Sequence, residues 1–395
     1  MADAPREAWI TGIGIVSCLG EGADAHWQGL SEQRVSVDTE TFAPYVIHKV
    51  TPLDFDKQIP KKGDQRQMEA WQRIGTYAAG LALADAGIKG DAELLARTDM
   101  IVAAGGGERD VTVDATILSN RGKAADPGTF LNERLMSDLR PTLFLAQLSN
   151  LLAGNISIVH GVTGSSRTFM GEEAAGVDAV RVALARIAAG QSELALVGGS
   201  HNAERAESLL LYEAGGHLLR GAFRPVWERG PAGGMALGSL GAFVVIEARS
   251  HAEARKARPL ARLTAVLSER SSRPAGAVAA ALARMWQGLK PAAGRAAVIS
   301  GTSGAEPATG EERGWLKTLP AVPVRATGSY VGHGFEPQFA MNIALATLAL
   351  AREKLFPPAA TSGVEHRYEG PLDQAVVTAV GHWRGEGMAL VEAVR

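Results

Sequence analysis

Cysteine is nearly absent from this chain of 395 residues, since Cys18 is the only one. A single thiol excludes an intramolecular disulfide and any metal site built from a cysteine cluster. The nine histidines show no HxH or HExxH spacing, so the sequence predicts no metal site.

An excess of either charge is also missing. Lys and Arg number 40 against 42 Asp and Glu, which gives a net charge of −2. This balance argues against a partner such as nucleic acid or an anionic membrane surface, because both require a basic excess. No apolar run reaches the ~18 residues of a membrane span, and the N-terminus lacks the apolar segment of a signal peptide. We therefore expect a cytoplasmic α/β protein.

The hydrophobic pattern alternates between short apolar runs and helical periodicity. It predicts strands near 8–16, 100–104, 166–170, 193–197, 235–249, 259–267, 296–300, 373–380 and 388–395. Helices are expected over 66–87, 143–152, 174–189 and 338–352, and 110–140 reads as polar and irregular. Met-Ala-Leu followed by an apolar strand occurs at 235–237 and again at 388–390. This weak repeat suggests two related α/β halves, 1–250 and 251–395.

One motif imitates a nicotinamide-dependent reductase. Gly12-Ile13-Gly14 follows a strand, but Ser17 replaces the third glycine of the dinucleotide-binding fingerprint. Tyr45 and Lys49 have the spacing of a reductase pair, yet they come far too early in the chain. A glycine turn after a strand is the simpler interpretation, and an NAD(P)-dependent reductase is the weaker alternative.

Two carboxylates, Glu172 and Glu173, precede the helix predicted at 174–189. In a structural interpretation they cap free N–H groups and complement the helix dipole. In a functional interpretation this strand-to-helix junction holds a nucleophile, because a helix N-terminus stabilises a thiolate or an oxyanion.

Five short motifs occur in the order and spacing of one family. They are Ile10–Gly20, Gly176 with Leu196–Gly199, Phe223-Arg224-Pro225 with Gly234–Gly238, Gly301-Thr302-Ser303, and Gly332-His333-Gly334. The chain thus resembles a β-ketoacyl-ACP synthase of the FabF/FabB type in the thiolase superfamily. The resemblance implies a thiolase-like fold in which two α/β halves form αβαβα layers. It also implies dimers that pair through the strand after the nucleophile segment.

The resemblance also shows which catalytic residues are missing. The family's Cys-His-His set and its lysine correspond to Glu173, Ser300, His333 and Gly328 in this chain. Cys18 cannot substitute, because it falls in the loop after the first strand. Phe169, Met170, His382 and Trp383 are candidates for lining or gating the pocket. If burial raises the pKa of Glu173, a neutral Glu would mimic the glutamine of two degenerate classes. These are the decarboxylating starter synthase and the chain-length factor.

Loss of one histidine and the lysine favours a non-condensing, chain-length-factor-like subunit. A malonyl-ACP decarboxylase or atypical acyltransferase using Glu173 and His333 is the alternative. The resemblance implies acyl carrier protein as a partner, and a homodimer or a heterodimer with a cysteine-bearing synthase. It implies no tightly bound cofactor, because phosphopantetheine arrives on the carrier protein. The blocks 59–68, 139–150 and 168–173 resemble more narrowly the second FabF-like protein of the α-proteobacterial very-long-chain fatty-acid cluster, which serves lipid A.

Overall fold

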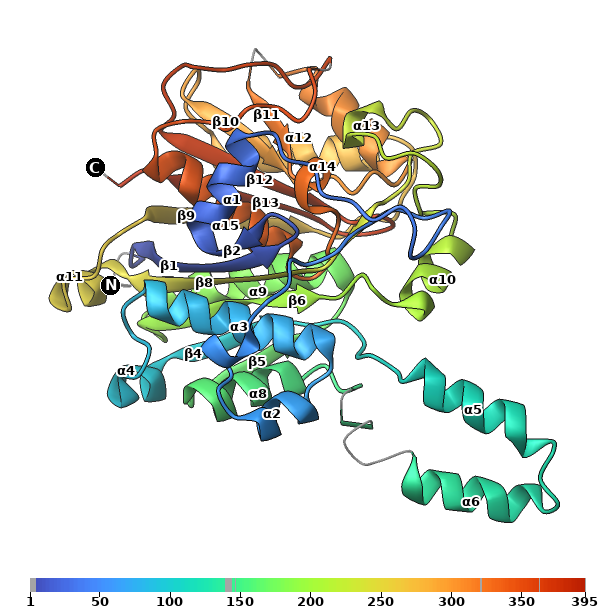
Figure 1. Cartoon of the computed structure of the whole chain (residues 1–395). Coiled ribbons are helices and arrows are strands. Elements are labelled where there is room, and N and C mark those ends of the chain that lie inside the picture. Colours follow the sequence, from blue (N-terminus) through green and yellow to red (C-terminus); the bar gives the residue numbers. More distant parts are fainter. Residues whose placement is uncertain (1–4, 139–143, 146, 320–321, 362, 395) are drawn as a thin grey trace.

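One continuous β-sheet organises the chain (Figure 1). The computed structural model describes residues 5–138, 144–145, 147–319, 322–361 and 363–394. The sheet runs in the order β11-β10-β12-β13-β9-β1-β8-β6-β4-β5. Its strands in the first half are β1 (Ala8–Ser17), β4 (Asp99–Ala103), β5 (Ser166–Phe169), β6 (Leu194–His201) and β8 (Leu240–Ala248). Those in the second half are β9 (Ala261–Glu269), β10 (Ala296–Ser300), β11 (Val324–Ala326), β12 (Gln374–Val380) and β13 (Glu386–Glu392).

The same strand order occurs twice. When the five strands of each half are numbered 1 to 5 along the chain, their order in the sheet, read from the outer edge to the centre, is 3-2-4-5-1 in both halves. In both sets the first two pairings from the outer edge are parallel and the next two are antiparallel. Strands β1 and β9 join the sets where Trp9 and Ile10 face Arg262 and Ala261. The weak sequence repeat therefore corresponds to a repeated topology, whereas the boundary at 250 stays a prediction.

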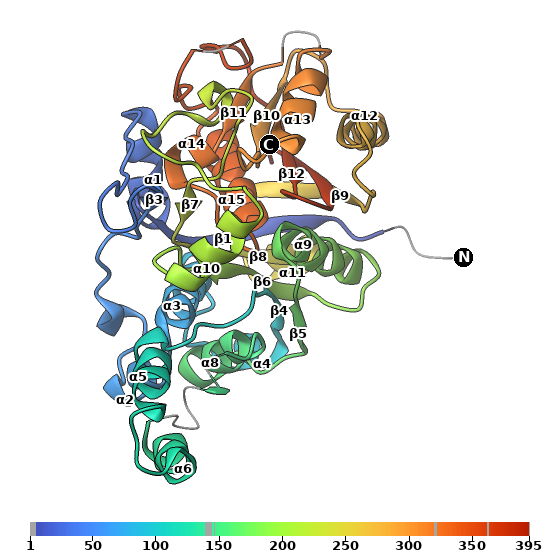
Figure 2. The same cartoon turned by 90° about the vertical axis from the view of Figure 1, so that its right-hand side faces the viewer.

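Helices form three layers around these strands (Figure 2). Helices α3 (Ala70–Asp85) and α8 (Leu151–His160) pack on strands of the first half. Helices α12 (Ala277–Leu289) and α13 (Ala308–Leu316) cover strands of the second half. Between the two sets, α9 (Glu172–Ala188) and α15 (Gln338–Ala351) contact each other and strands of both halves. The result is the expected αβαβα arrangement.

The central helices have sequences suited to complete burial. Every residue of α15 from Gln338 to Leu350 is buried, as expected of a helix that is apolar except at Gln338, Asn342 and Thr347, whose side chains form hydrogen bonds. In α9, a Cβ atom at Gly176 would collide with the carbonyl oxygen of Glu336. Glycine therefore lets α9 approach the chain just before α15 closely, which places the start of α9 beside the His333–Glu336 segment.

The glycines of the reductase-like motif have a packing role. Gly12 and Gly14 lie within β1, and a Cβ atom at either would collide with a carbonyl oxygen of α3, at Ala82 and Ala78 respectively. Lys49 forms an ion pair with Asp38 and does not join Tyr45. These contacts remove the structural basis for a dinucleotide-binding interpretation.

The expectation of irregular structure over 110–140 is wrong for the described residues. Helices α5 (Val111–Arg121) and α6 (Pro127–Ser137) project from the body of the protein (Figure 1). Asp110 and Asp126 cap them by accepting hydrogen bonds from backbone N–H groups two and three residues ahead. Only Ile117 is buried in the pair, so these helices lack the apolar stripe that periodicity analysis detects. The helix predicted at 143–152 falls partly outside the described residues, and α8 begins only at Leu151 and continues to His160.

Short elements complete the described chain. They are α1 (Gly22–Ser31), α2 (Lys62–Gln67), α4 (Ala92–Arg97), α10 (Ala206–Ala214), α11 (Arg249–Ala254), α14 (Gly328–Val331), the 3-10 turns 55–57 and 226–228, and strands β2 (Gly20–Glu21), β3 (Ile47–His48) and β7 (Leu237–Gly238). Within the residues described, we find no helix long and apolar enough to cross a membrane.

Candidate active site

Glu173 lies buried at the start of α9 and meets two histidines from the second half. Its side chain is 3% exposed. His333 Nε2 lies 2.8 Å from Glu173 Oε1, and His382 Nδ1 lies 3.1 Å from the same oxygen. The backbone N–H of His382 also donates to Oε1 over 3.1 Å. The structure thus joins two residues expected in the site with one that was expected only as a gating candidate.

The turn that presents Glu173 is tightly bent. β5 ends at Phe169, and Gly171 and Glu172 then have φ values of 127° and 55°. A positive φ is uncommon for a residue with a Cβ atom, and such conformations concentrate at functional sites. After the bend, α9 begins, so the carboxylate of Glu173 sits in the positive end of a helix dipole.

The hydrogen bonds determine the charge of Glu173. Burial alone raises the pKa of a carboxyl group and is the largest single influence here. The hydrogen bonds and charges of His333 and His382 together outweigh burial and lower the pKa of Glu173. The sequence left open a neutral Glu173 that mimics glutamine, and this geometry favours the ionised form. Because a carboxylate only accepts hydrogen bonds, both ring nitrogens must donate to it.

His333 and His382 are held differently. His382 has a raised pKa, because the hydrogen bond and charge of Glu173, together with the charge of Glu172, overcome the opposing and larger single effect of burial. The Nδ1 atom of His333 is buried and has no hydrogen-bond partner within the described part of the chain. The Nε2–H of His333 donates to Glu173, so this N–H is not available to stabilise an oxyanion.

Aromatic rings close the space around the histidines. The ring of Phe335 stacks on Tyr212 with centroids 4.4 Å apart. It also meets the rings of His333, His201 and His382 edge-on, at 4.7, 5.1 and 5.7 Å. Reasoning from the sequence missed Phe335, Tyr212 and His201. Only their positions next to the glycine motifs 332–334 and 198–199 could have marked Phe335 and His201 as candidates.

A cavity of about 290 Å³ adjoins this cluster. Glu172, His201, Arg205, Tyr212 and Glu336 contribute to its wall. Glu336 is buried, and burial together with the charges of Glu173 and Glu172 raises its pKa to about 7. Unlike Glu173, Glu336 therefore changes charge near neutral pH, and it lines this cavity.

Ser300 and Gly328 lie outside the hydrogen-bonded cluster. The hydroxyl of Ser300 donates to Glu312 over 2.9 Å, and its carbonyl accepts from the backbone N–H of Thr327. Thr327 donates to Asn342 over 2.6 Å and accepts from Gln338 over 3.2 Å. Gln338 in turn accepts from the N–H of Gly334, next to His333. Ser300, which was expected to be catalytic, therefore belongs to a supporting network, and Gly328 follows Thr327 of that network in the chain.

The four gating candidates differ in position. Phe169 packs against the main core, whereas Met170 is 66% exposed at the rim of the cavity. Trp383 is 46% exposed, and its indole N–H donates to Glu172 over 2.6 Å. His382 and Trp383 thus fasten the 381–385 loop to the two carboxylates at the start of α9.

Among the residues that the structure describes, one group of side chains offers ligand atoms for a metal. The donor atoms of Glu172, Glu173 and His382 lie within 4.8 Å of one another. These atoms already hydrogen-bond to one another, to His333 or to Trp383, so a cation would have to displace those bonds. Sequence spacing could not reveal this group, because about 210 residues separate His382 from the two glutamates.

Cys18 has a histidine neighbour but is poorly placed for nucleophilic chemistry. Its Sγ atom lies 3.6 Å from His48 Nδ1 and donates to the carbonyl oxygen of Tyr330 over 3.2 Å. Burial raises the pKa of Cys18 to about 12 and lowers that of His48 to about 3. A thiolate–imidazolium pair is therefore disfavoured.

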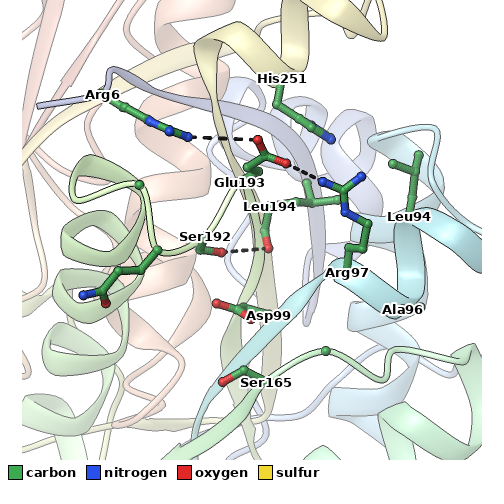
Figure 3. A pocket seen from close by; sticks show the side chains of 13 residues that line it. Arg6, Leu94, Ala96, Arg97, Asp99, Ser165, Ser192, Glu193, Leu194 and His251 are labelled. Atoms are coloured by element: carbon green, nitrogen blue, oxygen red, sulfur yellow. Dashed lines mark hydrogen bonds and ion pairs between the residues drawn. The ribbon is translucent and has the colours of Figure 1, made fainter. Parts of the chain in front are cut away.

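A larger cavity of about 490 Å³ lies elsewhere on the first half (Figure 3). Arg97 pairs with Glu193 at 2.6 Å, and Arg6 approaches the same carboxylate at 4.0 Å. The charged side chains in this cavity already have partners of opposite charge, and none of its lining residues belongs to the cluster around Glu173.

The comparisons with known proteins agree with this architecture. The family model described as "Beta-ketoacyl synthase, N-terminal domain" matches residues 6–252, so the chain belongs to the β-ketoacyl synthase family. The 3-oxoacyl-(acyl-carrier-protein) synthase 2 of Vibrio harveyi is 27% identical over 270 residues, which cover 65% of this chain and 61% of that protein. The chain thus matches less than two thirds of that relative's length.

Other matches extend over more of the chain. The tetracenomycin polyketide synthase ketoacyl synthase beta subunit of Streptomyces glaucescens is 26% identical over 380 residues, covering 91% of this chain and 89% of that protein. The solved ishigamide ketosynthase/chain length factor superposes with a TM-score of 0.82 at 20% identity, covering 99% of this chain and 100% of the other. This likeness confirms the thiolase-like fold.

Proposed function

We propose that this chain is a non-condensing, chain-length-factor-like subunit that pairs with a cysteine-bearing β-ketoacyl-ACP synthase. The observation that carries the proposal is the buried Glu173 carboxylate, which accepts hydrogen bonds from His333 and His382. A carboxylate is a weak nucleophile, and these hydrogen bonds weaken it further. The His333 N–H that could stabilise an enolate is occupied by the same carboxylate.

The same geometry disfavours the decarboxylase alternative. A malonyl group carries its own carboxylate, and an ionised Glu173 repels it at close range. Moreover, Ser300 donates to Glu312 and does not reach Glu173 through a hydrogen bond in the described structure. We infer that the cluster fills the reaction space instead of performing chemistry in it.

We propose that acyl carrier protein is a partner of this chain. A solved relative is described as a type II PKS acyl-carrier protein in complex with its ketosynthase, which supports this partner. We further propose that the chain acts in fatty-acid biosynthesis in the cytoplasm and that the products are the very-long-chain acyl groups of lipid A. The phosphopantetheine arm would come with the carrier protein, and the cavity beside Glu172 and Tyr212 is the place we expect it to approach. No resident cofactor is required.

Pairing with a second subunit is proposed through β5. The strand that follows Glu173, β6, has β8 and β4 on its two sides, so the expectation that this strand pairs across a dimer is wrong. β5 precedes Glu173 and pairs only with β4 in the described sheet, which leaves one edge free. An uncovered strand edge is a ready site for a partner strand. The strand that pairs with β5 would come from another copy of this chain or from the active synthase.

The test is co-expression and co-purification with a cysteine-bearing synthase, followed by condensation assays with and without this chain. We expect condensation or product length to depend on this subunit and to survive Glu173→Ala, with Glu172→Ala as the matched control. The proposal fails if this chain alone releases CO₂ from malonyl-ACP and Glu173→Ala abolishes that release. In that case Glu173 is catalytic.

A further inference from the structure

A second cavity, of about 280 Å³, lies at the edge of the second half. It is bounded by the chain after α15 and by the end of α1, and its wall includes Arg325 of the edge strand β11. None of its lining residues lines the cavity beside Glu173. The proposed function does not use this cavity.

Arg325 is unusual because its guanidinium is buried without being fully hydrogen-bonded. The residue is 1% exposed. Its Nε and Nη1 atoms donate to three carbonyl oxygens, those of Phe356, Val324 and His366. Its Nη2 atom is buried and has no hydrogen-bond partner among the residues that the structure describes. A guanidinium has five N–H donors, so this side chain keeps donors to offer.

The carboxylate that acts on Arg325 is only a partial counterion. Glu365 interacts with Arg325 through its charge, but its Oε1 atom accepts from the indole of Trp227 and from the N–H of Ala326. Burial raises the pKa of Glu365 to about 7. Near neutral pH this residue is therefore charged in only part of the molecules.

The cavity adds further cations and an apolar wall. Lys354 and Arg367 line it and are exposed, and Glu369 is the only acidic side chain in the lining. Within the described residues, neither Lys354 nor Arg367 forms an ion pair. Leu355, Phe356 and Pro357 supply apolar surface beside these charges.

We propose that this cavity binds the phosphate group of a small phosphorylated organic molecule. Arginine and lysine together are suited to phosphate, since guanidinium groups match its geometry and ammonium groups add a point charge. The cavity is far larger than the ~30 Å³ of one water and slightly below the ~300 Å³ at which drug-sized sites begin. It therefore has room for a phosphate and a short organic group against Leu355 and Pro357.

Binding is tested by calorimetric titration of the intact protein with glycerol phosphate and with inorganic phosphate, at constant ionic strength. We expect saturable binding of one glycerol phosphate per chain, tighter than that of inorganic phosphate. The double variant Lys354→Ala/Arg367→Ala should weaken binding by about tenfold or more, because charge-assisted hydrogen bonds are lost. The matched control Arg121→Ala/Lys123→Ala removes the same charge from the α5–α6 region and should leave binding unchanged.

Arg325→Met should abolish binding, with folding checked by thermal unfolding. If this variant fails to fold, the Lys354→Ala/Arg367→Ala variant still decides whether the cavity binds phosphate. The proposal is overturned if the wild-type protein shows no saturable binding. It is also overturned if the Lys354→Ala/Arg367→Ala variant and the control variant weaken binding equally. Equal affinity for inorganic phosphate and glycerol phosphate would overturn the claim that the ligand carries an organic group. None of these measurements depends on condensation activity.

Discussion

His333 Nε2 and Glu173 Oε1 lie 2.8 Å apart, in a contact between residues 160 positions apart in the sequence. The contact joins the start of α9 in the first half to the turn before α15 in the second half. Both side chains are buried, so the interaction is little screened by solvent. The two halves of the fold therefore meet at the site through a charged hydrogen bond.

The first prediction concerns the stabilising effect of this cluster. Glu173→Ala should lower the free energy of unfolding by about 3 kcal/mol at pH 7, because it leaves buried N–H donors of two histidines without an acceptor. Glu173→Gln should cost less, since the amide oxygen can still accept. Glu172→Ala is the control, because Glu172 is partly exposed. Urea unfolding measures all three, and equal losses for Glu173→Ala and Glu172→Ala would contradict the structure.

The second prediction concerns His382. Its folded-state pKa is raised, so its contribution to stability is complete below the unfolded value of about 6.5 and is lost as pH rises through the folded value. NMR titration of the imidazole signals should give a pKa above 6.5 in the wild type. Glu173→Gln should lower it clearly. An unchanged His382 pKa in that variant would show that Glu173 is not its electrostatic partner.

The third prediction concerns Glu336, whose pKa is raised to about 7. A carboxyl with a raised pKa costs stability as pH climbs from its unfolded value of about 4.5 through 7. Glu336→Gln should therefore become more stable relative to wild type at pH 8 than at pH 4.5, by up to about 3 kcal/mol. Urea unfolding at both pH values measures this. Combining the change with Glu173→Gln should reduce the benefit, because the charge of Glu173 is part of its cause.

The fourth prediction concerns Cys18, whose pKa is raised to about 12. At pH 8 only about one thiol in ten thousand is then ionised, and the thiolate is the reactive form. A disulfide reagent such as Ellman's reagent should modify native Cys18 far more slowly than the urea-unfolded chain. Rapid native modification would reopen the question of a cysteine nucleophile.

Local patterns were sufficient to predict much of the fold. The periodic segment 66–87 contains α3, and the apolar run 100–104 overlaps β4. Helices α5 and α6 were missed because they bury almost nothing, and their only signals are the caps at Asp110 and Asp126. The two Met-Ala-Leu segments hint at a repeat, but they do not reveal the strand order, since pairing between distant strands leaves little trace in local sequence.

The site was predictable only where a glycine motif marks it. Glu173 and His333 were placed by counting from Gly198-Gly199 and by Gly332-His333-Gly334. The bond between His382 and Glu173 spans 209 positions and includes a backbone N–H, which no residue type signals. The charge of Glu173 was equally hidden, because burial alone predicts the opposite shift of its pKa. The hydrogen bond from Ser300 to Glu312 likewise depends on packing between β10 and α13.

The fifth prediction separates packing from nucleotide binding at the first strand. A Cβ atom at Gly14 would collide with the carbonyl oxygen of Ala78 in α3, whereas one at Gly63 in α2 would meet nothing within 4 Å. Gly14→Ala should therefore lower the free energy of unfolding by about 2–3 kcal/mol or prevent folding. Gly63→Ala should change it by less than about 1 kcal/mol, with a gain expected from higher helix propensity. Urea unfolding compares the two variants, and NAD(P)H fluorescence titration is run on the wild type. If Gly14→Ala kept full stability and the wild type bound NAD(P)H, Gly14 would have a role in nucleotide binding. The interpretation that Gly14 allows β1 to pack against α3 would then be wrong.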